Sequence, residues 1–267
     1  MRDPYQTEEW AKIKEGFGYE VLKAGNTYLY TRRTPLGNFV DVQYPVDPAD
    51  IVGNEIMKMK PISLSIFNDL QYSGSSFEGF GHERSRVSCK VDLTLSAQEL
   101  WDGLKKQNRS AIRQAERKGC EFRIGKTDED FEAFYDHYSS LARLKHFRLL
   151  KKDVMKRTFK SPIASIYISC VNGEPAAMAF VLHSDMIARF WYGAGAPRFY
   201  VFRPSNFLHW KIILEAKSRG CLYYDLDGDS PFKASFGGKP YYQQIAVRKS
   251  LRSRLAETLV SIKRSVA

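Results

Sequence analysis

The feature that most constrains the fold is a run of three predicted strands followed by a long helix. Ile163–Val171 and Ala176–His183 are apolar and rich in β-forming residues, and Asn172-Gly173 between them is a preferred two-residue hairpin turn. Met186–Tyr192 predicts a third strand, and apolar side chains at helical spacing predict a helix over Asn206–Arg219. Together these segments predict an antiparallel meander covered by a helix.

Capping residues predict where the helices of the second half begin and end. Ser96 and Glu99 form a capping box, in which each side chain bonds the other residue's backbone N–H. We expect this helix to run without a break to Gly119, which suits the left-handed conformation after a helix. Ser205 is expected to cap the helix 206–219. Further helices are expected from Thr127 onward and over 151–159, strands over 120–124, 222–226 and 242–247, and a basic terminal helix over 248–264.

The first 95 residues predict a smaller α/β unit. A short helix is expected over Gln6–Lys14, and Gly25-Asn26 is a hairpin turn between two predicted strands. Prolines 45, 48 and 61 break up one segment, and Ser73–Glu83 is rich in glycine and serine, as surface loops and lids are. Strands are expected over 19–22, 27–32, 38–44, 61–67 and 86–93. We therefore expect two domains, residues 1–95 and 96–267.

The chain carries a strong positive charge. Its 41 lysines and arginines stand against 30 acidic residues, which gives a net charge of +11. Such a surplus favours polyanionic partners: RNA, nucleotide pyrophosphates or anionic lipid headgroups. The basic residues concentrate in Lys105–Arg123, Lys145–Lys160 and Arg248–Arg264, each of which is also typical of a solvated helix face. We expect no stable complex with DNA, and one hypothesis for the terminal helix is peripheral contact with an anionic membrane.

Cysteine and histidine spacing argues against a metal centre. Cys89, Cys120, Cys170 and Cys221 are far apart, and the five histidines are scattered. No apolar stretch approaches the roughly 18 residues of a membrane span, and the N-terminal residues lack the apolar core of a signal peptide. We expect a soluble cytoplasmic protein that binds no metal and carries no cofactor.

The predicted order of helix, helix, meander, helix, strand and strand resembles the Gcn5-related acetyltransferase (GNAT) fold. Within that order, several motifs resemble the FemABX family of aminoacyl-tRNA-dependent transferases, which build peptidoglycan bridges. Each motif alone is weakly specific, whereas their common order along nearly the whole chain is fairly specific. The motifs are Gln6-Thr7-Glu8-Glu9-Trp10-Ala11, Val91-Asp92-Leu93, Asn108-Arg109-Ser110-Ala111-Ile112-Arg113-Gln114-Ala115 before Gly119, Asn206-Phe207-Leu208-His209-Trp210, Tyr224-Asp225, and Phe232-Lys233-Ala234-Ser235-Phe236-Gly237-Gly238.

The resemblance implies an α/β (α+β) fold with two GNAT-like subdomains, each a mixed, largely antiparallel sheet flanked by helices, the first one reduced. It also implies an aminoacyltransferase that takes an aminoacyl group from aminoacyl-tRNA and passes it to an amine. The acceptor would be a peptide or a cell-wall precursor, linked to a nucleotide or to a lipid. Two alternatives stay open: an acyl-CoA-dependent N-acyltransferase of the same fold, and a non-catalytic descendant that binds RNA or peptides.

The last motif of the resemblance carries the candidate chemistry. Aminoacyl transfer passes through a tetrahedral oxyanion, which a fixed cation stabilises. The resemblance implies that Lys233, beside Phe232, stabilises this oxyanion or a donor phosphate, in a loop whose Gly237 and Gly238 permit close approach of a ligand. Composition alone would make Lys233 a surface lysine. One of the alternating aspartates Asp225, Asp227 and Asp229 is expected to orient the attacking amine, with Asp225 as the candidate, and the alternative is that it caps the loop.

Further candidates would bind the substrate. Arg198 and Arg203 are interleaved with aromatic residues, which suits phosphate contact and base stacking at a tRNA acceptor end. This bulky stretch stands where an acyl-CoA enzyme would carry a glycine-rich loop for the pyrophosphate. The alternative is an aromatic core edge with two surface arginines. Asn206 follows it, and Arg109 and Arg113 on an earlier helix are candidate phosphate contacts, with a solvated helix face as the alternative.

Overall fold

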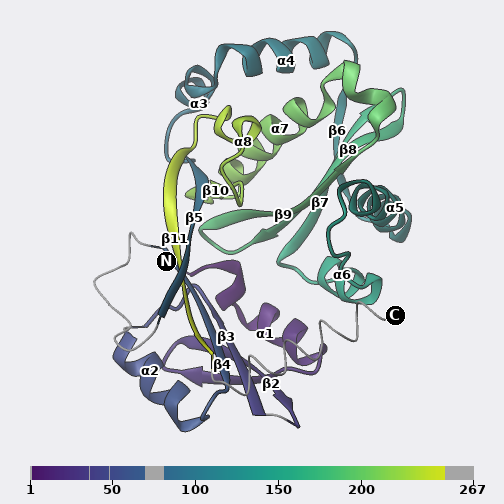
Figure 1. The fold of residues 1–267 in the computed structure, drawn as a ribbon. Coiled ribbons are helices and arrows are strands. Elements are labelled where there is room, and N and C mark those ends of the chain that lie inside the picture. Colours follow the sequence, from purple (N-terminus) through teal and green to yellow (C-terminus); the bar gives the residue numbers. More distant parts are fainter. Residues whose placement is uncertain (1, 36, 48, 70–80, 250–267) are drawn as a thin grey trace. The chain divides into compact units, whose positions relative to one another are not determined.

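The structure is a computed structural model that describes residues 2–35, 37–47, 49–69 and 81–249 (Figure 1). Most of the expected loop Ser73–Glu83 and of the expected terminal helix 248–264 lies outside these residues. The chain forms two compact units. Unit 1 holds Tyr5–Val87 and the chain from Tyr241 on, and unit 2 holds Arg2–Pro4 together with Ser88–Pro240.

These units differ in extent from the expected domains 1–95 and 96–267. The chain enters unit 2 at Ser88, within a strand, and leaves it again after Pro240, at the start of another strand. A single boundary at residue 95 cannot describe these units, because the chain passes from one unit to the other and back. Each of the two strands at which it passes is divided between the units. The short N-terminal segment Arg2–Pro4 also belongs to unit 2, although the residues that follow it build unit 1.

Unit 1 is a sheet with a helix on each face. Its strands follow the order β1-β2-β3-β4-β11. β3 and β4 pair in parallel, whereas the other neighbours are antiparallel, and Gly25-Asn26 joins β1 to β2 as predicted. The elements are η1 (Pro4–Gln6), α1 (Glu8–Glu15), β1 (Glu20–Ala24), β2 (Thr27–Thr34), β3 (Gly37–Gln43), α2 (Ala49–Lys58), β4 (Ser63–Asp69), the first part of β5 (Gly81–Asp92), and β11 (Lys239–Lys249).

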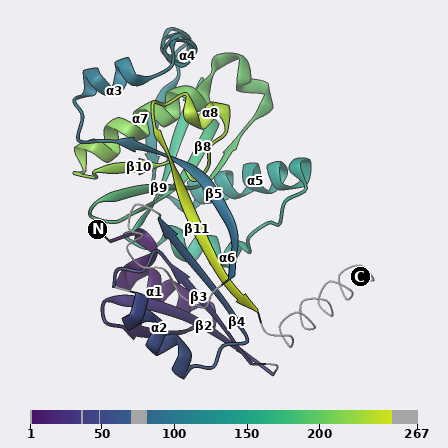
Figure 2. The ribbon, with the colours of Figure 1, turned by 60° about the vertical axis from the view of Figure 1, so that its left-hand side comes forward.

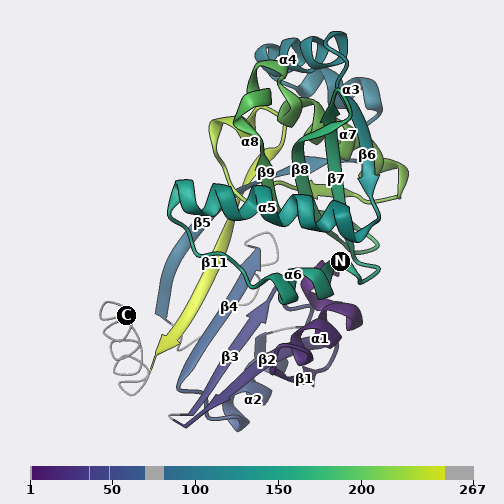
Figure 3. The same cartoon turned by 90° about the vertical axis from the view of Figure 1, so that its right-hand side faces the viewer.

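The helix α2 was not expected from the sequence. The prolines at positions 45, 48 and 61 lie outside its bounds, so they delimit a helix instead of breaking up the segment. Val52 and Ile56 of α2 are fully buried and pack with Leu29 of β2. The next residue, Tyr30, faces α1, since the ammonium of Lys14 lies 5.1 Å from its ring centre. The two helices therefore cover opposite faces of the sheet (Figures 2 and 3).

Unit 2 contains the predicted meander. Its strands follow the order β5-β10-β9-β8-β7-β6, and Asn172-Gly173 joins β7 to β8, as predicted. Neighbouring strands from β6 to β9 pair antiparallel with one another, whereas β9 and β10 pair in parallel. The elements after β5 are α3 (Ala97–Gly103), α4 (Lys106–Arg117), β6 (Glu121–Gly125), α5 (Asp128–Lys145), α6 (Lys152–Phe159), β7 (Ala164–Val171), β8 (Glu174–His183), β9 (Ile187–Gly195), η3 (Pro197–Phe202), α7 (Pro204–Ser218), β10 (Tyr223–Asp225) and α8 (Pro231–Ala234).

Helices cover both faces of the unit 2 sheet, with α4 and α7 on one side and α5 and α6 on the other (Figures 1 and 3). Ala179 of β8 faces α7 and shares a buried cluster with Ile112 and Ile213. The neighbouring Phe180 points the other way, and its ring centre lies 5.5 Å from that of Phe134 in α5. The mixed α/β fold class expected from the sequence is confirmed.

The single helix expected from Ser96 to Gly119 is wrong, because two helices, α3 and α4, occupy this stretch. The capping box at Ser96 and Glu99 is present. The break at Leu104 is stabilised by hydrogen bonds that replace those of a continuous helix. Arg109 donates to the carbonyl oxygens of Asp102 and Leu104, and the N–H of residue 105 donates to the carbonyl oxygen of Ser235 at 3.0 Å.

The helix α7 begins with a different cap from the expected one. Arg203, with a φ of 59°, is the N-cap, and Pro204 is the first helical residue. Proline suits this position because the N–H that it lacks would have no partner in the helix. Ser205 lies inside the helix, so the expectation that it caps α7 is wrong.

The sheet of unit 2 opens beside β9. The parallel pairing of β9 and β10 covers only Ile187–Arg189 and Tyr223–Asp225, and β9 continues to Gly195. A β-bulge at Trp191 adjoins this opening, since Val181 pairs with Phe190 and the preceding Phe180 with Tyr192. Bulges re-aim side chains and are common beside functional sites. The opening is therefore where a site is expected.

We expect Gly237→Ala to destabilise the protein more than Gly119→Ala does. Both glycines have a positive φ, +77° and +75°, so both variants bear the same conformational cost of about 1 kcal/mol. A Cβ at Gly237 would also lie 2.7 Å from the carbonyl oxygen of Gly103, whereas a Cβ at Gly119 would meet nothing within 4 Å. Urea unfolding should show an excess loss of at least about 1 kcal/mol for Gly237→Ala; equal losses would contradict this packing.

Candidate active site

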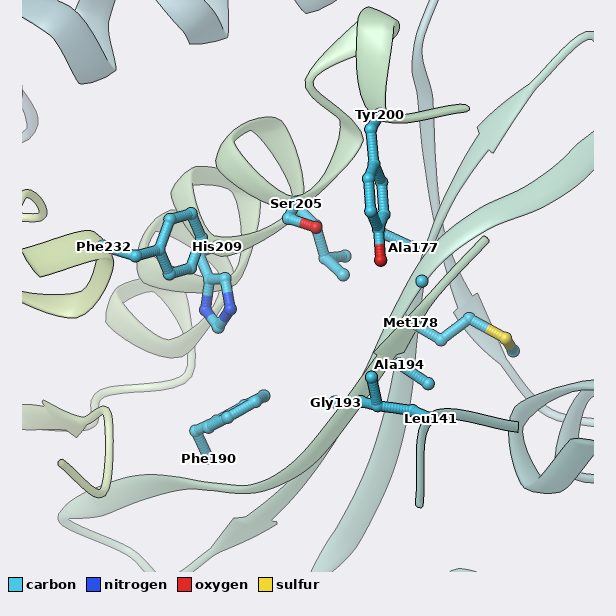
Figure 4. A pocket seen from close by; sticks show the side chains of 12 residues that line it. Leu141, Ala177, Met178, Phe190, Gly193, Ala194, Tyr200, Ser205, His209 and Phe232 are labelled. Atoms are coloured by element: carbon cyan, nitrogen blue, oxygen red, sulfur yellow. The ribbon is translucent and has the colours of Figure 1, made fainter. Parts of the chain in front are cut away.

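Three adjoining cavities lie in unit 2. The β9 cavity measures about 300 Å³, the α4 cavity about 450 Å³ and the α5 cavity about 320 Å³. Phe232 lines both the β9 and the α4 cavity, and Tyr200 lines both the β9 and the α5 cavity. The β9 cavity is lined by Leu141, Ala177, Met178, Phe190, Gly193, Ala194, Gly195, Tyr200, Ser205, Leu208, His209 and Phe232 (Figure 4).

Small residues on β8 and β9 keep the β9 cavity open. Gly193 is required by the Phe190 ring, since a Cβ there would lie 2.6 Å from that ring. Ala177 and Ala194 contribute little volume next to it. The bulge at Trp191 leaves Phe190 on the α7 face, where its ring centre lies 5.0 Å from that of His209. The opening in the sheet is therefore an apolar chamber between β9 and α7.

His209 of α7 is the histidine of this chamber. It is 5% exposed, and its Nδ1 atom lies 2.8 Å from the hydroxyl of Tyr224 in β10. Burial, with a smaller contribution from the positive charge of Lys233, lowers the pKa of His209 to about 3. Burial raises the pKa of Tyr224 well above its ordinary value. Both groups are therefore neutral at physiological pH.

Lys233 of α8 is held in place by the loop before it. Its Nζ atom donates to the carbonyl oxygen of Asp227 at 2.8 Å and lies 5.3 Å from the ring centre of Phe190. Ser230 caps the short helix by accepting from the Lys233 N–H. Such contacts to backbone and aromatic ring differ from those of a loose surface lysine. Phe232, 37% exposed, packs edge-on against the His209 ring.

A buried ion pair supports the loop that holds Lys233. The guanidinium of Arg189 in β9 lies 2.7 Å from a carboxylate oxygen of Asp225, and these two side chains are 1% and 0% exposed. Arg189 also forms an ion pair with Asp3, from the N-terminal segment of unit 2. A buried arginine of this kind is stable only because both carboxylates offset its charge.

The Asp225 carboxylate organises the turn that follows it. Its Oδ1 atom accepts from the N–H of Asp227 and from the hydroxyl of Ser88, both at 2.9 Å. The Ser88 oxygen in turn accepts from the N–H of Gly228 at 2.8 Å. This turn presents the Asp227 carbonyl oxygen to Lys233. The contacts therefore connect Arg189 to Lys233 through Asp225 and the turn.

Asp225 does not face the β9 cavity as an amine-orienting group would. Alternation along β10 points Tyr224 toward α7 and Asp225 to the opposite face. The Asp225 side chain is also fully buried. We therefore assign Asp225 a positioning role in place of the catalytic role expected from the sequence.

Four expected substrate-binding residues line none of the three cavities. Gly237 and Gly238 pack against the backbone of residues 103 and 90, where a Cβ would come within 2.7 and 3.1 Å of backbone atoms. Arg109 caps the end of α3, and the Arg113 guanidinium lies 5.3 Å from the ring centre of Trp101. These contacts give the four residues packing and capping roles, and a substrate-binding role for them stays a prediction.

The other expected substrate-binding residues do line cavities. Arg203 and Asn206 line the α4 cavity, where the amide of Asn206 donates to Asn108 at 2.8 Å. Asn108 is 1% exposed and donates to the carbonyl oxygen of Ser235. Arg198 lines the α5 cavity and forms an exposed ion pair with Glu174.

Sequence reasoning missed His209 and Arg189 as site residues. His209 lies within a quoted motif, but a single histidine on an apolar helix face resembles a core residue. Arg189 stands in a predicted strand, and its partner Asp3 is 186 residues away. The position of Arg189 inside a predicted apolar strand could have indicated a buried ion pair, because a buried charge needs a partner.

Neither a metal site nor a membrane-spanning helix is found in the part of the chain that the structure describes. No group of three or more His, Cys, Asp or Glu side chains is placed there to hold a metal ion. Within the same residues, no helix combines the length and the apolar character that crossing a bilayer requires.

Comparison with known proteins gives the class of the domain first. Residues 103–234 match the acetyltransferase (GNAT) domain family. This stretch includes all three cavities apart from one residue, Ser235 of the α4 cavity. A search among curated protein sequences gives no significant match.

Solved structures extend the structural similarity to nearly the whole chain. The crystal structure of FemX is 12% identical, with a TM-score of 0.71 over 97% of this chain and 94% of that one. The C-terminal domain of a putative lysylphosphatidylglycerol synthetase from Agrobacterium fabrum is 16% identical, with a TM-score of 0.64 over 91% and 88%. L-PGS from Bacillus licheniformis is 12% identical, with a TM-score of 0.62 over 99% and 97%.

These likenesses confirm the FemABX-like GNAT fold that the motifs suggested. At such low identity the structures show the fold alone. Together with the GNAT domain match, the fold supports an acyltransferase in general terms.

We expect Arg189→Met to lower the free energy of unfolding by about 3–5 kcal/mol, because it removes a buried cation that pairs with two buried carboxylates. Arg219→Met is the matched control. Arg219 pairs with Glu215 on the surface of α7, with side chains 37% and 28% exposed, and its loss should cost less than about 1 kcal/mol. Urea unfolding of both variants checks the prediction, and similar losses would contradict it.

Proposed function

We propose that this chain transfers an aminoacyl group from aminoacyl-tRNA to an amine of a peptide or cell-wall precursor. The observation that supports tRNA as the donor is the structure of the segment between β9 and α7, which contains η3. The lysine of the last motif, held beside the β9 cavity, supports the chemistry.

The start of α7 is poorly suited to the pyrophosphate of a standard acyl-CoA. Such a site relies on backbone N–H groups at a helix start. Here Pro197 and Pro204 have no N–H, and the N–H of Arg203 donates to the carbonyl oxygen of Tyr200 at 3.1 Å. The 3-10 helix η3 fills the segment with bulky side chains in place of glycine. These features favour a donor that is recognised in another way.

The same segment has the character of a surface for single-stranded RNA. Tyr200 is 49% exposed, Arg203 is exposed, and the Arg198 side chain is 66% exposed. Lys118, the C-cap residue of α4, adds a positive charge, with its ammonium 5.4 Å from the ring centre of Phe202. Arginines beside aromatic rings bind phosphates and stack on bases. We infer that the acceptor end of the tRNA lies along η3, with its ester reaching the β9 cavity.

The proposed reaction needs charge stabilisation at one point. The lone pair of a neutral acceptor amine attacks the ester carbonyl carbon, and the C=O π electrons move to the oxygen. When the C=O re-forms, the C–O bond to the ribose breaks, and the ribose oxygen takes up the proton that the nitrogen loses. The products are an amide and a tRNA with a free hydroxyl. The ammonium of Lys233 stabilises the transient oxyanion.

An acyl-CoA-dependent N-acyltransferase is the second candidate, because the domain match is to acetyltransferases. The fold restricts the choice of acceptor less than the η3 segment restricts the choice of donor. Both FemX and a putative lysylphosphatidylglycerol synthetase share this fold. We infer a peptide amine as the acceptor. A tRNA donor also places the reaction in the cytoplasm, where aminoacyl-tRNA is made.

A transfer assay tests the donor. The protein is incubated in parallel with a pool of radiolabelled aminoacyl-tRNAs and with labelled acyl-CoAs, each with an amine-bearing peptide, a nucleotide-linked peptide precursor or phosphatidylglycerol vesicles. We expect label to pass from aminoacyl-tRNA to a peptide amine. Label from acyl-CoA alone would contradict the tRNA donor. Binding of tRNA without any product would indicate a non-catalytic protein.

Lys233→Ala should lower turnover at least about tenfold while the folded fraction stays unchanged, because a charge that acts on the oxyanion is lost. Lys239→Ala is the control, since Lys239 is an exposed lysine six residues further on. The measurement is turnover in the transfer assay, with circular dichroism to verify folding. If the two variants are equally active, Lys233 has no part in the mechanism.

A further inference from the structure

The hydrogen bond between His209 and Tyr224 determines which nitrogen of the histidine carries the proton. Among the described residues, the Tyr224 hydroxyl has a single hydrogen-bond partner, Nδ1 of His209 at 2.8 Å. If Nδ1 carried the proton and donated it, the hydroxyl proton of Tyr224 would be buried without an acceptor. Such an unpaired buried group costs about 1–3 kcal/mol. Tyr224 is therefore the donor, and the neutral imidazole carries its proton on Nε2.

The Nε2–H group of His209 is directed at the β9 cavity and not at another protein group. Within the described chain the structure gives Nε2 no hydrogen-bond partner, while the residue is 5% exposed and lines the cavity. Figure 4 shows the imidazole between Phe232 and Phe190 at the edge of the open space. Both rings lie close to it, with centre distances of 5.5 and 5.0 Å. A fixed donor in so apolar a wall is suited to an acceptor atom of a ligand.

We propose that the Nε2–H of His209 donates a hydrogen bond to the carbonyl oxygen of the acyl group that occupies the β9 cavity. This proposal rests on the proposed acyl transfer, and it adds a catalytic residue to it. A carbonyl oxygen is an acceptor only, so it matches a neutral donor. As the tetrahedral intermediate forms, the same bond shortens on the oxyanion and contributes to its stabilisation. The proton stays on Nε2 throughout, because His209 binds charge and does not transfer a proton.

The division of labour between His209 and Lys233 follows from their surroundings. Burial, with a smaller contribution from the positive charge of Lys233, keeps the nearby imidazole neutral. Two neighbouring cations would compete for the same acceptor and repel each other. A neutral N–H beside an ammonium avoids this repulsion while still supplying two attractive groups. Tyr224 acts as a positioning residue, since it reaches the substrate only through His209.

The chain contains a matched control pair. His183 of β8 lies 3.2 Å from the hydroxyl of Tyr167, is 8% exposed, and has a pKa lowered to about 3 by burial. This pair resembles His209 and Tyr224 in burial and in its tyrosine partner, although the hydroxyl lies against Nε2 of His183 and against Nδ1 of His209. His183 lines none of the three cavities. Its replacement should therefore affect stability without affecting transfer.

The first test is nitrogen-15 NMR of the full chain, which distinguishes the two neutral tautomers of histidine. We expect His209 to be the Nε2–H form, and Tyr224→Phe to remove this preference. The probes are an alanyl amide of 3′-amino-3′-deoxyadenosine, which mimics the aminoacyl end of a tRNA, and acetyl-CoA. The His209 Nε2 signal should shift with the first probe. A shift with acetyl-CoA alone keeps the carbonyl contact and rejects the tRNA donor, whereas a shift with neither probe, or an Nδ1–H form, overturns the proposal.

The second test is kinetic. His209→Leu should lower kcat about 100-fold with a smaller change in KM, as the loss of an oxyanion donor does. His209→Gln, whose amide N–H replaces Nε2–H, should retain activity to within about tenfold of the wild type, and His183→Leu to within about threefold. Wild-type kcat in folded His209→Leu would overturn the proposal. If the wild-type chain transfers from neither donor, the proposed function fails, and the NMR titration still decides the role of His209.

Discussion

The candidate site depends on one buried interaction, the ion pair between Arg189 and Asp225. Both side chains are almost completely removed from water, so their charges are offset by each other, by Asp3 and by the hydrogen bonds that Asp225 accepts. The Asp225 carboxylate then fixes the turn at Asp227, and that turn holds the ammonium of Lys233. A charge buried on one face of the sheet thus determines the position of a charge beside the cavity. Removing any member of this sequence of contacts should disturb all the members that follow it.

The cavity itself results from an incomplete sheet. β10 pairs with β9 over three residues only, and residues from the rest of β9 and from α7 line the cavity together. The walls are apolar, which makes each polar group inside them count for more than it would in water. The site is consequently defined by a small number of groups: an ammonium held by a backbone carbonyl and a neutral imidazole held by a tyrosine. Both are oriented by contacts that lie outside the cavity.

Much of the fold was predictable because it rests on local signals. The Asn172-Gly173 hairpin, the Ser96 capping box and the alternating strands are set by neighbouring residues, and all appear as expected. The break at Leu104 was not predictable, since it depends on Ser235 and Gly237, which are distant in the chain. Lys233 emerged only through a family resemblance, and the same resemblance assigned substrate roles to glycines that the structure explains by packing. The role of His209 depends on Tyr224 and the cavity, neither of which a local pattern reveals.

The route of the chain between its two units has an evolutionary consequence. Residues 2–4 and 88–240 form one unit, while 5–87 and the strand after 240 form the other, so neither unit corresponds to one continuous stretch of coding sequence. Exchange of a single genetic segment would separate Asp3 from Arg189 or divide a border strand. Recombination at a single boundary therefore cannot exchange one unit intact, in contrast to chains whose domains simply follow one another.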